Sequence, residues 1–559
     1  MSIRTLAASM LAFGLLAASP AAAQPDDPSD VPLDEELSGG SEPTPSAGRR
    51  TRERPRAQIQ PYLELNAGAS AELSGGSDDV LTYTSVAAGV DAWVETRRVA
   101  VQASYRYERR IALEGELADD DVHSGVAMVH AEAAPGLSLD AGAMATRTGG
   151  PGRPTVLSED VPSAQLYSAY AGPTLNTRVG PMTVGAAYRL GYVRVDQGDD
   201  DLAGGFGGGD FESVAHNATA SIGMSPGHLP FGWTVGGGYV REESGELENR
   251  FEGSYIRGDV VVPVGPTLAL TAGVGYETME SSQLDVVRDA GGVPILVDGR
   301  LVPDPSRPRL HALDRSGLIY DGGIIWRPTP RTELQARAGH RYGGTTFTGS
   351  LEHRINQSYA LSASIYDNVS SFGRLLVADL SGVPQAFDIR RSGFGGGIGG
   401  VPGCIYGNDP STGVCFDDAL QSINNFNFRS RGANLQFSGG RGPWGFGLGA
   451  GYNNRRYFAP PGGDFVLRGV TDQSFSLSAH ASRKLSRTSG VDVATYANWF
   501  DSGIAGSDGA FSTGVTGAYY QSIFHDRLQA HASAGIYSTQ SGPFDSTVGS
   551  VLFGLRYSF

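Results

Sequence analysis

The sequence is poor in cysteine and in long apolar runs, and each shortage excludes a class of protein. Two cysteines in 559 residues are too few for a scaffold held together by disulfides. The only apolar run that approaches membrane length lies at the extreme N-terminus, which excludes a helical membrane protein. Glycine is plentiful, with 79 residues, but it lacks the three-residue period of collagen. With 40% hydrophobic residues the chain can still bury a large apolar surface.

Positive charge and catalytic motifs are scarce as well. Lysine and arginine number 43 against 59 acidic residues, and there is no large basic cluster to neutralise nucleic acid phosphates. The motifs HExxH, GxSxG and the phosphate-binding loop of nucleotide-binding proteins are absent. His531 near Ser533 would suit a hydrolase, but no acid is placed to orient the histidine. We predict no enzyme, no cofactor, no metal site and no nucleic acid partner.

The N-terminus has the features of a secretory signal. Arg4 precedes a short apolar stretch, and the small residues Ala21 and Ala23 stand where a signal peptidase cleaves. We expect a signal peptide over 1–23, cleaved after Ala23. Residues 24–56 are rich in proline, serine and acids and then in arginine, which predicts a disordered periplasmic linker. Residues 57–559 remain for the folded domain.

This remainder repeats one pattern, in which apolar and polar residues alternate over roughly ten to fifteen positions before a turn. In residues 99–107 the odd positions are valine, alanine and tyrosine, whereas the even positions include Gln102, Ser104 and Arg106. Such strands have one apolar and one polar face. In a membrane barrel the apolar face contacts lipid and the polar face lines the lumen, whereas a soluble sandwich buries the apolar face.

The lengths of the connectors separate these two folds. Tight turns follow every second strand, and the connectors between them are mostly long and polar, for example 197–210, 282–314 and 372–423. The short Gly343-Gly344 turn is an exception. Short turns on one rim and long loops on the other are typical of outer-membrane barrels. We predict an all-β, transmembrane, antiparallel up-and-down barrel of about 22 strands (range 18–24), without a plug domain because only residues 24–56 precede the first strand.

The last strand carries a terminal aromatic pattern. Phe553, Leu555, Tyr557 and Phe559 stand at every second position, and the chain ends on Phe559. This looks like the C-terminal signature that the barrel assembly machinery recognises in Gram-negative outer-membrane proteins. Over roughly 57–559 the chain also resembles porin-like barrels of alphaproteobacteria, in stretches such as RGPWGFGLGAGYNNRRYFAP and FGLRYSF. The resemblance implies an outer-membrane location, with lipid and lipopolysaccharide around the barrel and the assembly machinery as a partner.

Charged residues at inward positions are candidates for solute selectivity, because rings of fixed charge and the pore diameter decide which solutes pass. Inward arginines would favour anionic solutes. Alternatively, these residues neutralise carboxylates on adjacent strands, which is a structural role. The candidates are Arg106, Glu108, Arg110, Arg189, Glu333, Arg337, Arg341 and Arg455.

The longest connector, 372–423, contains both cysteines. Cys404 and Cys415 flank an Asn408-Asp409-Pro410 turn, and an oxidising compartment favours a disulfide between them, which contributes about 2–3 kcal/mol by closing the loop. A metal site would need further ligands such as histidine, and none is nearby. We predict that the disulfide pins this connector, which folds into the mouth or lumen and narrows the passage.

These features together predict a porin-like channel for passive passage of small hydrophilic solutes. Two alternatives stay open: a conduit for polysaccharide export and a non-conducting surface barrel whose loops adhere or protect. The sequence leaves the solute and the oligomeric state undetermined.

Overall fold

A computed structural model gives the structure of most of the chain. The residues that it describes are 56–74, 80–114, 120–149, 163–196, 210–297, 300–387, 404–407, 413–420, 423–460, 469–504, 509–524, 527–542 and 544–559. The predicted signal peptide and nearly all of the predicted linker lie outside them.

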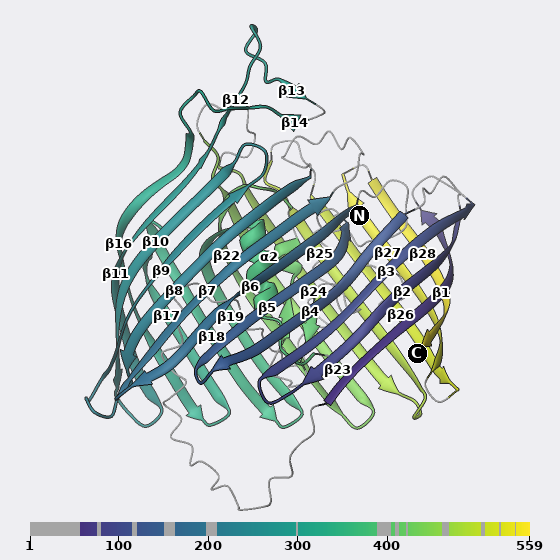
Figure 1. Cartoon of the computed structure of the whole chain (residues 1–559), viewed down its shortest axis with the longest axis horizontal. Coiled ribbons are helices and arrows are strands. Elements are labelled where there is room, and N and C mark those ends of the chain that lie inside the picture. Colours follow the sequence, from purple (N-terminus) through teal and green to yellow (C-terminus); the bar gives the residue numbers. More distant parts are fainter. Residues whose placement is uncertain are drawn as a thin grey trace, which may run out of the picture.

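A 22-stranded antiparallel sheet dominates the described residues (Figure 1). The first eleven strands are β1 (Arg56–Ser74), β2 (Val80–Glu95), β3 (Val99–Glu114), β4 (Asp120–Ala134), β5 (Leu137–Gly149), β6 (Ser163–Val179), β7 (Met182–Asp196), β8 (Phe211–Met224), β9 (Gly232–Ser244), β10 (Asn249–Pro263) and β11 (Leu268–Gln283). The others are β16 (Leu310–Thr329), β17 (Thr332–Arg341), β18 (Gly344–Asn356), β19 (Tyr359–Ser371), β22 (Asn427–Arg441), β23 (Trp444–Tyr457), β24 (Thr471–Lys484), β25 (Ser489–Asp501), β26 (Ala510–Ile523), β27 (Leu528–Ser541) and β28 (Phe544–Ser558).

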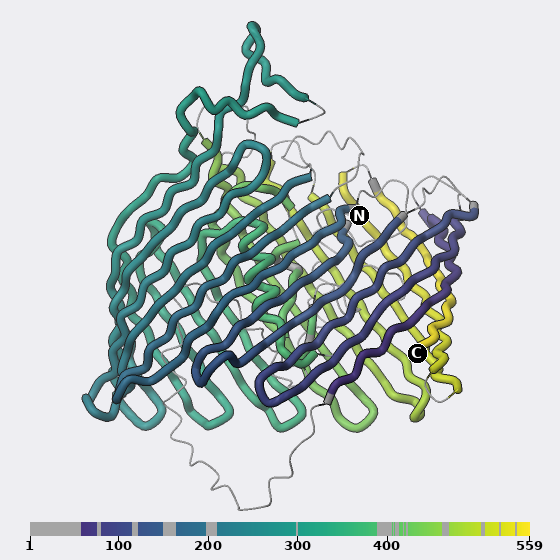
Figure 2. Tube along the Cα trace, in the orientation of Figure 1, coloured from purple at the N-terminus to yellow at the C-terminus, as the bar shows by residue number. Residues whose placement is uncertain are grey.

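The sheet closes on itself because its first and last strands pair. Leu63 of β1 lies opposite Tyr557 of β28, and the backbone N–H of Phe559 donates to the carbonyl of Pro61 at 3.0 Å. The purple and yellow ends of the chain accordingly lie side by side in Figure 2. Closure leaves no unpaired edge along these strands, as a barrel in lipid requires. The predicted number of strands and their antiparallel order are confirmed.

Side chains alternate between the two faces of the wall in the predicted sense. Tyr105 is 43% exposed and Leu190 is 41% exposed on the outer face, whereas Glu108 and Arg110 on the inner face are 3% and 4% exposed. The large apolar side chains of the outer face have no protein neighbours to cover them, and a lipid bilayer removes that surface from water. The structure is therefore an outer-membrane type of barrel and not a two-layer soluble sandwich.

The two rims differ as the connector lengths predict. Tight turns join β6 to β7 and β22 to β23, and their Gly180 and Gly442 adopt φ of 63° and 61°, which a side chain would strain. At the opposite rim the chain between β11 and β16 projects beyond the wall (Figure 1). This projection, residues 284–309, contains β12 (Asp285–Val286) paired with β15 (Pro303–Asp304) and β13 (Leu296–Val297) paired with β14 (Arg300–Leu301).

We refer to the connector between β19 and β22, residues 372–426, as the insert, and its described residues lie inside the barrel. It contains α2 (Phe372–Ser381), β20 (Cys404–Tyr406) paired with β21 (Gly413–Cys415), and α3 (Asp417–Leu420). Helix α2 packs on β5, β6, β7 and β8 within the outline of the wall (Figure 1). No described helix is long and apolar enough to cross a membrane. The prediction of a barrel without a plug domain is wrong, because the lumen contains a folded element supplied by an internal connector.

Candidate functional site

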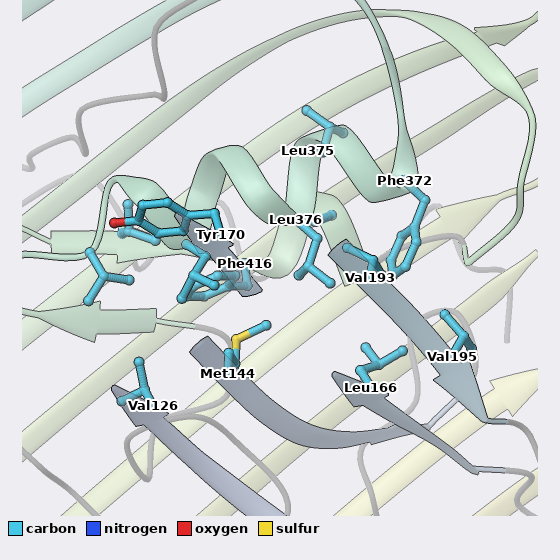
Figure 3. Packing of buried hydrophobic residues seen from close by; sticks show 14 of the residues in the cluster. Val126, Met144, Leu166, Tyr170, Val193, Val195, Phe372, Leu375, Leu376 and Phe416 are labelled. Atoms are coloured by element: carbon cyan, nitrogen blue, oxygen red, sulfur yellow. The ribbon is translucent and has the colours of Figure 1, made fainter. Parts of the chain in front are cut away.

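The insert contacts the wall through an apolar surface. Phe372, Leu376 and Leu380 of α2 are fully buried against inward-facing side chains such as Leu166 and Val193 (Figure 3). The cluster extends around the lumen and draws wall residues from seven strands: Val126, Met128, Met144, Ala164, Leu166, Tyr170, Val193, Val195, Phe211, Phe428 and Tyr457. Each large apolar side chain that leaves water contributes about 1.5–3 kcal/mol. The insert is therefore docked on the wall and does not float in the lumen.

A buried ion pair holds the first turn of α2. The Arg374 Nε donates to Glu242 Oε2 of β9 at 2.9 Å, and the two side chains are 11% and 2% exposed. Ser213 and Ser371 also donate to the Glu242 carboxylate, both at 2.6 Å, while Ser371 caps α2 by accepting from the Arg374 backbone N–H. Burial lowers the pKa of the Arg374 guanidinium, whereas the Glu242 carboxylate acts to raise it. We call the Glu242–Arg374 pair the latch.

Further contacts fix the insert at other places around the ring. Gln102 of β3 donates to the carbonyl of Phe387 at 2.6 Å and accepts from its N–H at 3.1 Å. Near the other end of the insert, Asn424 donates to the Tyr457 hydroxyl of β23 at 3.1 Å. Because β3, β9 and β23 are well separated in the strand order, the insert crosses the lumen between these anchors.

Gly373 gives a sharp test of this docking. An added Cβ would lie 2.6 Å from the Ser213 hydroxyl and 2.9 Å from Glu242 Oε1. Alanine favours an isolated helix over glycine by about 1 kcal/mol, yet we expect Gly373→Ala to loosen the insert because it displaces α2 from the latch. Faster hydrogen exchange of the α2 amides measures this loosening, and slower exchange would contradict the geometry.

The predicted lumen charges do face inward, where each has partners. Arg106 bridges Glu64 and Glu108, both at 2.8 Å, and Arg110 reaches the same Glu108 carboxylate at 3.3 Å. On the far side of this network Arg556 of β28 binds Asp91 at 2.6 Å. The network spans β28, β1, β2 and β3, so it ties together the strands at which the barrel closes.

The other candidates join separate pairs. Arg337 and Arg257 share the carboxylates of Asp259 and Asp321 at 2.6–3.2 Å. The remaining contacts are Arg341 with Glu277 at 2.9 Å, Glu333 with Arg327 at 2.9 Å, Arg189 with Asp140 at 3.2 Å, and Arg455 over the Phe428 ring at 4.6 Å. The eight candidates thus do not form one site. A role in selectivity stays a prediction, and cross-strand neutralisation describes their contacts.

Two residues that matter most for the lumen were missed from the sequence. Glu242 occupies an inward position of β9, but nothing local marks it as the partner of a residue more than a hundred positions away. Arg374 lies in connector 372–423, for which the sequence predicts a position in the mouth or lumen but no helix. The spacing of Phe372, Leu376 and Leu380 is a helical signal that would have revealed α2.

Comparisons with known proteins concern the architecture. No family model and no curated protein matches the chain. Among solved structures, the chain is similar to the FrpB iron transporter from Neisseria meningitidis, at 11% identity, covering 89% of this chain and 82% of that one with a TM-score of 0.44. The ferric-catecholate import receptor Fiu from E. coli matches at 9% identity, 89% and 81% coverage and a TM-score of 0.44. The siderophore receptor PiuA from Acinetobacter baumannii matches at 9% identity, with 89% of this chain and 82% of that one covered and a TM-score of 0.44.

The insert corrects the functional prediction. Its described residues cross the lumen and pack on inward-facing side chains of seven strands. A passive porin is therefore wrong, and neither a polysaccharide conduit nor a surface barrel gains support. The resemblance to alphaproteobacterial porin-like proteins has no family model behind it. The coarser prediction, a closed antiparallel β-barrel of the outer-membrane type, is confirmed.

Proposed function

We propose that the protein is a gated outer-membrane transporter of the receptor type. In its resting state the insert closes the lumen, and a solute crosses the barrel only after the insert has moved away from part of the wall. The observation that carries this proposal is the apolar surface buried between α2 and the inner faces of β5–β8.

The composition of the wall supports a closed resting state. Most inward positions of a water-filled barrel are polar, because they contact water. Val193, Val195 and Phe211 interrupt that rule, and all three are buried beneath the insert. Exposing such side chains to water is unfavourable, so the docked arrangement is the stable one unless a solute or a partner offsets the cost.

Single-channel recording in planar bilayers tests the proposal with the full chain. We expect the purified protein to rest closed, with no steady conductance, and to conduct only when the insert is disturbed. Iron and ferric catecholate complexes, which the similar structures are named for, are the first solutes to apply. A full-length barrel that conducts steadily without any solute would overturn the proposal.

We also propose a disulfide within the insert. Cys404 and Cys415 are direct partners in the β20–β21 ladder, and no free cysteine occurs among the described residues. The intact mass of the unreduced protein is expected to be about 2 Da below that of the reduced protein, since a disulfide lacks two hydrogens. Reduction should also speed hydrogen exchange in β20 and β21, because the bond stabilises a small loop by about 2–3 kcal/mol. Equal masses would contradict the disulfide.

A further inference from the structure

The wall has a notch at the rim that carries the long loops. Strands β17 and β18 meet in a two-residue turn, Tyr342-Gly343, with φ of 53° and 68°, and the neighbouring strand β16 continues beyond this hairpin to Leu310. Residues 310–319 of β16 pair only with β11, and residues 366–371 of β19 pair only with β22. A gap therefore adjoins the hairpin on both sides: β16 extends beyond it without a partner there, and residues 344–348 of β18 have no ladder with β19. We call this gap, bounded by 310–319, 342–345 and 366–371, the wall notch.

Arginines gather around the wall notch. Arg315 of β16 donates to the Tyr342 carbonyl at 2.8 Å, and Arg429 and Arg431 of β22 donate to the Thr345 carbonyl at 3.3 and 2.8 Å. The fourth arginine, Arg456 of β23, is exposed and lies opposite Arg429 in the register.

Negative charge does not balance these four arginines. Asp367 accepts from both Arg429 and Arg431, at 2.6 and 3.1 Å, and it serves two guanidinium groups at once. Among the residues that the structure describes, Arg315 and Arg456 have no carboxylate within ion-pair distance. The next carboxylate, Glu277 of β11, accepts from the Tyr342 backbone N–H at 2.9 Å and is already paired with Arg341 at 2.9 Å. On the outer face, Glu280 lies 3.4 Å from His311. The wall notch therefore has an excess of positive charge.

A cavity of about 550 Å³ occupies the wall notch. Its lining includes Arg315, Arg429 and Arg456 beside the apolar side chains of Met279, Leu313 and Val369, and it includes no carboxylate. Volumes of this size hold small ligands or headgroups. Guanidinium groups next to apolar surface suit an amphiphile with an oxyanion, because arginine binds phosphate oxygens through paired hydrogen bonds.

The outer face below the cavity indicates where such an amphiphile would come from. Leu318 of β16, Phe347 of β18 and Ile365 of β19 point outward and are 65%, 60% and 55% exposed. These side chains contact acyl chains when the barrel is in a membrane. The arginines lie above them at the long-loop rim, which is the level of the headgroups.

We propose that the wall notch binds a phosphate group of an outer-leaflet lipid, with Arg315, Arg429 and Arg456 as its ligands. The lipid places its phosphate in the cavity and its acyl chains against Leu318, Phe347 and Ile365. The site belongs to the wall and involves no residue of the insert, so it is independent of the gated transport proposed above.

The test measures lipid retained by the full chain. The protein is reconstituted in phosphatidylcholine vesicles with a minor fraction of lipid A, which carries two phosphates, then extracted and analysed by native mass spectrometry. The variant Arg315→Ala/Arg456→Ala removes two ligands that have no carboxylate partner. The matched control, Arg441→Ala/Arg487→Ala, removes the same charge from exposed positions at the short-turn rim.

We expect the wild type and the control to retain lipid A. The notch variant should retain at least about tenfold less lipid A, because charge-assisted hydrogen bonds are lost. Equal retention by all three would overturn the site. If millimolar inorganic phosphate displaces the lipid completely, the notch is a site for free anions, and the lipid assignment fails. Should the double variant not fold, Arg456→Gln alone keeps the test decisive, because this exposed side chain contributes no described contact.

Discussion

Removal of the insert is expected to convert a closed barrel into a wide open pore. Ser371 and Asn427, which precede and follow the insert, are direct partners across β19 and β22, so an Asn-Gly turn can replace residues 372–426 without disturbing the ladder. A barrel of 22 strands encloses a broad lumen, and we expect large, steady single-channel conductance steps that the closed full chain does not show. Planar bilayer recording measures the change.

The projection at the same rim supplies the matched control. Gln283 and Leu310 are partners across β11 and β16, so residues 284–309 can be replaced by the same turn. This segment lies beyond the wall in Figure 1 and should leave the conductance unchanged. If removal of the insert leaves the barrel silent, or if both deletions open it equally, the insert is not the closure. The insert-free barrel should still retain lipid A, which separates the gating proposal from the notch proposal.

Breaking the latch is expected to open the barrel intermittently. Arg374→Ala leaves the Glu242 carboxylate buried with two serine donors but without its cation, and removal of one partner from a buried pair costs about 3–5 kcal/mol. Part of that cost is avoided if the insert leaves the wall, so the undocked state gains population. We expect brief openings in single-channel records and faster hydrogen exchange over 372–387.

Two further variants distinguish the latch from a general loss of charge. The double variant Glu242→Gln/Arg374→Ala removes the uncompensated carboxylate and should open less often than Arg374→Ala alone. Arg194→Ala breaks the exposed Arg194–Asp196 pair on β7, in which the side chains are 48% and 31% exposed, and such pairs contribute about 1 kcal/mol or less. Openings in the Arg194 variant that match those of Arg374→Ala would rule out the latch as their cause.

The barrel could be predicted from the sequence because its determinants are local. Successive side chains of a strand face opposite sides, so Tyr105 and Arg106 could be assigned to lipid and lumen without knowledge of their neighbours. The last strand is also predictable locally, because its apolar residues stand at every second position. Phe553 and Phe559 are 63% and 66% exposed on the outer face, as that pattern predicts.

The sequence predicts that connector 372–423 folds into the mouth or lumen, but not how it docks there, because the docking depends on contacts between distant segments. The prediction of no plug domain rests on the short segment 24–56 before the first strand, whereas the insert lies between the late strands β19 and β22. The pairing of Arg337 with Asp259 and Asp321 joins three strands, and it follows from the register of the closed sheet. Val193 and Val195 are a signal in the sequence for a folded element in the lumen, because apolar side chains on a water-facing surface are normally buried by other protein.

The attachment of the insert to the wall has a mechanical consequence. Ser371 and Asn427 are the last pair of their ladder, so both ends of the insert are attached to the wall at adjacent positions. The insert can swing outward about this double tether while every strand keeps its neighbours. Under the proposed gating it also stays joined to the barrel when displaced, so the same insert can dock again on the same inner surface of the wall after a solute has passed.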